Sequence, residues 1–162
     1  MHNSALKYWW LGMAALVLDL LSKWAANTYL TFMQPVAVLP HFNLMLNYNT
    51  GAAFSFLADA GGWQRWAFVV LGVVMVAGML WWLRKLPPRL NCESGALWLV
   101  IGGALGNLVE RLLDGRVTDF FDFYWGSWHY ATFNVADVAI SVGAFCLILQ
   151  EFVLKKRTEP KA

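Results

Sequence analysis

Long apolar segments separated by polar stretches dominate the sequence. Four of them, at about residues 8–28, 66–83, 96–113 and 134–154, are long enough to cross the roughly 30 Å hydrocarbon core of a bilayer as helices. Residues 42–49 differ, because apolar and polar side chains alternate along them, which predicts a strand with one apolar face. We therefore expect an all-α membrane protein with four transmembrane helices and a small extracytoplasmic β element between helices 1 and 2.

The composition indicates one integral membrane domain over residues 1–162. Hydrophobic residues make up 59% of the chain and charged residues 14%, and the mean hydropathy is +0.50. A net charge of +2 is too small to suggest nucleic-acid binding. The positive-inside rule places both termini and the loop between helices 2 and 3 in the cytoplasm, because these segments carry Lys7, three cations at 84–89 and four at 155–161. The loops at 29–65 and 114–133 then face outward.

The outward loops carry turn signals and aromatic residues. Asn49, Thr50 and Gly51 predict a turn, either an ordinary hairpin or an edge that pairs with a peptide substrate. Residues 55–66 are expected to return through a short interfacial helix. In the second loop, we expect Asp114 and Asp122 to face water and the aromatic residues at 124–130 to form an interfacial collar.

No metal or cofactor site is predicted. The three His residues are scattered, and no Cys and His spacing resembles a zinc site. Cys92 in the cytoplasmic loop and Cys146 in the fourth span are expected at different depths, which argues against a disulfide.

Several polar residues interrupt or flank the apolar segments, and each has a structural explanation. Asp19 and Lys23 share a helix face and can form an ion pair. Gly102 and Gly106 allow close helix packing. Asn134 suits a helix N-cap, with an acid three residues later favoured by the helix dipole.

Their common depth favours a functional explanation. With the orientation above, six of them fall in the outer third of the membrane, and buried polar groups need partners, so we expect them to converge on one site. These residues are Lys23, Asn107, Arg111, Asp119, Asn134 and Asp137. Two Asp side chains that share a proton can hydrolyse an amide: one takes a proton from water and the other donates to the scissile carbonyl.

Five motifs resemble those of the bacterial lipoprotein signal peptidases (signal peptidase II), a family of aspartic intramembrane peptidases. They are Asp19-Leu-Leu-Ser-Lys23, Asn49-Thr-Gly-Ala-Ala-Phe54, Gly103-Ala-Leu-Gly-Asn-Leu-Val-Glu-Arg111, Val117-Thr-Asp-Phe120 and Phe133-Asn-Val-Ala-Asp137. Any one motif is weak, but all five in this order between four spans are specific. Glu110 is a departure, because the family usually has Asp there.

The resemblance implies cleavage of diacylglyceryl-modified prolipoproteins on the amino side of the lipidated Cys, without a cofactor. It implies Asp119 and Asp137 as the catalytic pair. The expected substrate-binding residues are Asp19, Lys23, Asn49, Gly51, Asn107, Arg111 and Asn134. The resemblance further implies a bacterial inner-membrane location with the site near the outer face, prolipoproteins and membrane lipid as partners, and inhibition by globomycin; we expect a monomer.

Two other functions are compatible with charges in membrane spans. An ion- or proton-coupled carrier would be expected to show internal repeats and polar groups spread through the membrane depth, and the sequence has neither. A non-enzymatic assembly factor would tolerate Asn at positions 119 and 137.

Overall fold

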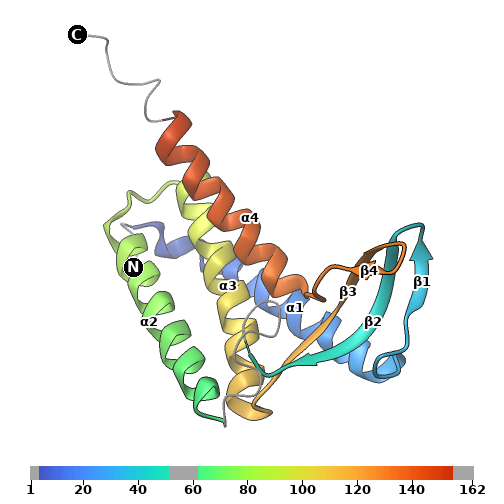
Figure 1. Ribbon diagram of the computed structural model, residues 1–162. Coiled ribbons are helices and arrows are strands. Elements are labelled where there is room, and N and C mark those ends of the chain that lie inside the picture. Colours follow the sequence, from blue (N-terminus) through green and yellow to red (C-terminus); the bar gives the residue numbers. More distant parts are fainter. Residues whose placement is uncertain (1–3, 52–61, 155–162) are drawn as a thin grey trace.

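The computed structural model describes residues 4–51 and 62–154, and its four long helices confirm the predicted spans (Figure 1). They are α1 (Trp9–Tyr29), α2 (Trp63–Lys85), α3 (Cys92–Leu113) and α4 (Val135–Leu149). A 3-10 turn, η1 (Ala5–Tyr8), precedes α1, and a π-helical turn, η3 (Gln150–Leu154), continues α4. Counted with η1 before α1 and with the continuation of α4 to Phe152, all four helices are long and apolar enough to cross a membrane. Most of the segment at 55–66, for which we expected an interfacial helix, lies outside the described residues, as do residues 52–54.

The β element is confirmed, and it is larger than the sequence indicated. Four antiparallel strands pair in the order β1 (Val36–Leu39), β2 (Phe42–Asn49), β3 (Val117–Trp125) and β4 (Trp128–His129). Strand β2 has the predicted bounds. Strands β3 and β4 come from the segment between α3 and α4, so the sheet joins this segment to the one that follows α1 (Figure 1).

The single apolar face predicted for β2 is interrupted. The register against β3 shifts between Leu44 and Asn47, and the buried residues of β2 are Asn43 and Leu46, three positions apart. Alternation therefore holds only on each side of the irregularity.

Asp122 is fully buried, so the prediction that it faces water is wrong. Its position on β3 is opposite Asn43, which donates a hydrogen bond of 2.9 Å to its carboxylate. Nδ1 of His129 on β4 lies 2.8 Å from the same carboxylate. Neighbouring strands on both sides thus supply the partners that water would otherwise provide. Asp114 is exposed, as expected.

Helix α3 packs against α1, α2 and α4. The prediction that two glycines allow close helix packing is confirmed. A side chain at Gly102 would meet the backbone of Gly12 in α1, and a side chain at Gly106 would meet Asp19. The close approach to α1 and α4 brings polar groups from three helices to the end of the bundle nearest the sheet.

The two cysteines are free thiols, but the prediction that they lie at different depths is wrong. Cys92 begins α3, and its Sγ lies 3.8 Å from the carbonyl oxygen of Cys146 in α4. The reason is that α3 starts beside the later turns of α4.

Candidate active site

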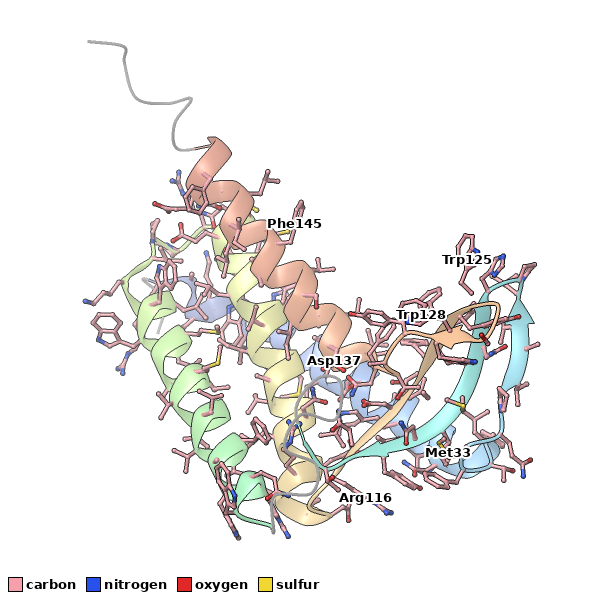
Figure 2. All side chains as sticks on the ribbon, viewed as in Figure 1. Met33, Arg116, Trp125, Trp128, Asp137 and Phe145 are labelled. Carbon is pink, nitrogen blue, oxygen red and sulfur yellow. The ribbon has the colours of Figure 1, made fainter. Side chains whose placement is uncertain are left out.

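Asp137 lies in the first turn of α4, where the helix meets the sheet, as Figure 2 shows. Asn134 caps this helix: its side-chain oxygen accepts from the Asp137 N–H at 3.0 Å, and Asp137 accepts from the Asn134 N–H at 3.3 Å. The capping explanation drawn from the sequence is therefore correct.

The cap also connects the two acids. The side-chain amide of Asn134 donates a 2.7 Å hydrogen bond to Asp119 Oδ1 on β3. The oxygen of the Asn134 amide accepts from the backbone N–H of Asp137, so the nitrogen of the same amide is directed at Asp119. One fully buried residue thus contacts both Asp residues that the sequence singled out.

Asn107 on α3 contacts the other carboxylate. Its amide nitrogen donates to Asp137 Oδ1 at 2.8 Å. Its oxygen accepts from Lys23 Nζ at 2.8 Å and from Asn134 at 3.2 Å. Helices α1, α3 and α4 therefore all contribute to the support of Asp137.

Asp19 and Lys23 do more than neutralise each other. They form the predicted ion pair, at 2.8 Å, and both are buried. The other oxygen of Asp19 accepts from the backbone N–H of Ala136, at 2.8 Å. Because Ala136 directly precedes Asp137, this bond ties the start of α4 to α1.

Arg111 extends from α3 toward the turn after β2. It donates to the carbonyl oxygen of Gly51 at 2.8 Å, and its guanidinium lies 5.1 Å from the ring centre of Phe68. Glu110 forms an ion pair with Lys23 at 3.2 Å and accepts two hydrogen bonds from Thr118.

Both Asp residues line one cavity of about 460 Å³. Its polar lining comes mainly from the predicted residues, and its apolar lining comes largely from the exposed side of α4. The lining residues are Asn49, Asn107, Arg111, Val117, Asp119, Tyr130, Ala131, Thr132, Phe133, Asp137, Val138, Ile140, Ser141 and Val142. Asp19, Lys23 and Asn134 do not line the cavity. Lys23 contacts the lining residue Asn107 and Asn134 contacts the lining residue Asp119, whereas Asp19 is connected to the cavity only indirectly, through Lys23. Gly51 does not line the cavity either, but its carbonyl oxygen binds the lining residue Arg111.

The pKa of Asp119 is raised from its ordinary value of 3.8 to about 7. Burial is the larger cause and the negative charge of Asp137 the second, while hydrogen bonds from Asn134 and Asn49 and the charge of Lys23 oppose them. Asp119 therefore keeps its proton at mildly acidic pH and can donate a hydrogen bond into the cavity.

Two supporting residues, Thr118 and Asn27, were not predicted from the sequence. Thr118, which precedes Asp119, also accepts a 3.1 Å hydrogen bond from Asn27. Asn27 is four residues after Lys23 and so on the same helix face, a signal that could have identified it. Within residues 4–51 and 62–154, no cluster of His, Cys, Asp and Glu could hold a metal ion.

Comparisons with known proteins give a consistent result. A family model described as signal peptidase (SPase) II matches residues 11–153. The lipoprotein signal peptidase of Hydrogenovibrio crunogenus is 57% identical over 162 residues, which is all of this chain and 94% of that protein. That of Actinobacillus succinogenes is 47% identical over 160 residues, covering 99% of this chain and 96% of the relative.

A solved structure has the same fold. It is described as a bacterial membrane enzyme determined by the in meso method at 2.3 Å resolution, and it matches with a TM-score of 0.83. The match covers 100% of this chain and 98% of the other, at 23% sequence identity.

Proposed function

The chain belongs to the signal peptidase II family, and we propose that it removes the signal peptide from diacylglyceryl-modified prolipoproteins, cleaving on the amino side of the lipidated Cys. Membership of this family favours a protease of the bacterial inner membrane over the carrier and the assembly factor considered from the sequence. The observation that carries the proposed mechanism is that Asp119 and Asp137 line one cavity and share Asn134 as a partner.

In the proposed reaction, Asp137 is the base and Asp119 the acid. A water molecule gives one proton to Asp137 as its oxygen bonds to the scissile carbonyl carbon, and Asp119 protonates the carbonyl oxygen. When the C–N bond breaks, the proton on Asp137 passes to the leaving nitrogen, and a hydroxyl of the tetrahedral intermediate returns a proton to Asp119. The raised pKa of Asp119 supports this assignment of the acid.

The cavity has the chemistry that such a substrate needs. Amide and guanidinium groups of Asn49, Asn107 and Arg111 lie on its wall and can bind peptide groups. Val138 and Val142, on the side of α4 that is exposed in the isolated chain, offer an apolar wall to acyl chains or a signal-peptide helix.

The position of the site is also part of the proposal. Asp137 lies where α4 meets the sheet, at one end of the bundle (Figure 2), and the cationic segment that ends α2 lies at the other end (Figure 1). Applied to this arrangement, the positive-inside rule puts both termini in the cytoplasm and the acids near the outer face. Inhibition by globomycin and a monomeric state stay predictions.

The test uses purified protein and a lipidated prolipoprotein. Asp119→Asn and Asp137→Asn should each abolish cleavage while the protein stays folded, because Asn can neither supply nor take up the proton. Asp114→Asn, at an exposed acid beyond the end of α3, is the matched control and should cleave at the wild-type rate. Wild-type cleavage by either active-site variant would disprove the dyad.

A further inference from the structure

Glu110 has contacts that the proposed reaction does not yet use. It lies in the last turn of α3, and its side chain is 13% exposed. Its two carboxylate oxygens accept from the backbone N–H of Thr118 at 2.9 Å and from the Thr118 hydroxyl at 2.7 Å. A helix carboxylate thus holds one residue of a strand by both its main chain and its side chain.

Thr118 is the residue directly before the catalytic Asp119. It is 3% exposed, and its carbonyl oxygen lies 3.3 Å from the side-chain amide of Asn134, the same amide that donates to Asp119. Any displacement of Thr118 therefore moves the backbone of Asp119 and at the same time changes the contacts of both residues with the Asn134 amide.

Neutralising Lys23 does not account for this geometry. Lys23 already has Asp19 at 2.8 Å, and its contact with Glu110 is longer, at 3.2 Å. The shorter contacts of Glu110 are those to Thr118. A residue needed only for its charge would not require both oxygens to be aligned with a strand.

The Lys23 contact nevertheless connects Glu110 to the second acid. Lys23 also donates to Asn107, and Asn107 donates to Asp137. From Glu110, one set of contacts therefore leads through Thr118 to Asp119, and another leads through Lys23 and Asn107 to Asp137.

We infer that Glu110 is a positioning residue for the reaction, which sets the place of Asp119 relative to Asp137 by holding Thr118 against the end of α3. The inference rests on the proposed function of the two acids. Glu110 is not among the residues that line the cavity, so it acts through Thr118 and not on the substrate.

The first measurement separates turnover from binding. Glu110→Ala should lower kcat about 10- to 100-fold, the range expected when reacting groups shift by up to about 1 Å. KM should change little, because no substrate contact is removed. Glu110→Gln keeps one acceptor oxygen for Thr118 and should have an intermediate kcat, whereas a role in charge alone would make Gln as harmful as Ala.

The second measurement is a double-mutant cycle on kcat. Thr118→Val keeps the shape and the backbone N–H but removes the hydroxyl that binds Glu110. Its effect should be smaller in the Glu110→Ala background than in the wild type, because the shared contact is already lost. If Glu110→Ala fails to fold, the cycle is run between Glu110→Gln and Thr118→Val.

The outcomes are distinct from those of the dyad test. Wild-type kcat in Glu110→Ala, or additive effects in the cycle, would overturn the positioning role even if Asp119→Asn is inactive. Active Asp119→Asn would overturn the proposed function itself. Asp114→Asn serves again as the control, since its exposed acid lies four residues after Glu110, and it should leave kcat unchanged.

Discussion

The raised pKa of Asp119 makes the stability of the fold depend on pH. Asp119 is 2% exposed, and its pKa lies at about 7 in the folded protein against an ordinary value of 3.8. Between these two values the folded chain holds the proton more tightly than the unfolded chain. Stability is therefore highest at low pH and falls as the pH rises toward 7.

The magnitude follows from the difference of about 3 between the two pKa values. Each pKa unit corresponds to about 1.4 kcal/mol, so the full cost of ionising Asp119 in the folded state is about 4 kcal/mol. The fold should lose about 3 kcal/mol of stability between pH 5 and pH 8, because the rest of this cost is already present at pH 5.

Asp119→Asn removes the ionisable group with little change of shape, and its side-chain oxygen can still accept from Asn134. We expect the stability of the variant, relative to that of the wild type, to increase by about 3 kcal/mol from pH 5 to pH 8. The free energy of unfolding can be measured with guanidinium in detergent micelles, followed by tryptophan fluorescence. Other groups titrate in both proteins, so the difference isolates Asp119 and the partner coupled to it.

Asp114→Asn is the matched control and should follow the wild type at every pH. A difference between wild type and Asp119→Asn that is constant from pH 5 to pH 8 would refute the reasoning, because the folded state would then not disfavour the charge. A difference of the opposite sign would mean that the site stabilises the ionised carboxylate, and Asp119 could not be the resting acid.

Three further substitutions test the supports of the site. Gly106→Ala should destabilise the fold by about 1–3 kcal/mol, because the new methyl group would meet Asp19, whereas Gly78→Ala, with open space around it, should be neutral or slightly stabilising in thermal unfolding. Lys23→Met should cost about 3–5 kcal/mol, since it leaves buried Asp19 without its cation, and the yield of folded protein should fall. Asn134→Ala should cost about 1 kcal/mol through the lost cap and should lower kcat about 100-fold in the cleavage assay, because Asp119 loses the donor that also connects it to Asp137.

The elements that the sequence predicted correctly are those set by local pattern. Span lengths follow from runs of apolar residues, and β2 follows from the alternation along residues 42–49. Strand β3 has no such alternation: Phe120 and Phe121 are adjacent, and four consecutive residues, 117–120, are buried. Because β2 and β4 pair with β3 on both sides, its burial depends on tertiary contacts that a local pattern does not contain.

The convergence of the polar residues was predictable, but their pairing was not. The cost of burying polar groups indicated that Asp119 and Asp137 would share one site, and both line the same cavity. Which group donates to which depends on how the end of α3 faces β3, and the contact between Glu110 and Thr118 shows this most clearly. The error at Asp122 has the same cause, because its partners lie on neighbouring strands.

Amides, not cations, make the direct contacts to the two acids, and this suits the proposed mechanism, in which the pair shares a proton. Among the described residues, no ion pair joins Asp119 or Asp137 to a Lys or Arg. A cation in contact with Asp119 would lower its pKa and remove the proton that the proposed mechanism assigns to it. Lys23 is held one residue away and fixes the orientation of Asn107 by binding its oxygen, so the amide nitrogen must face Asp137. The buried charge of Lys23 therefore orients Asn107 without a direct contact to either acid.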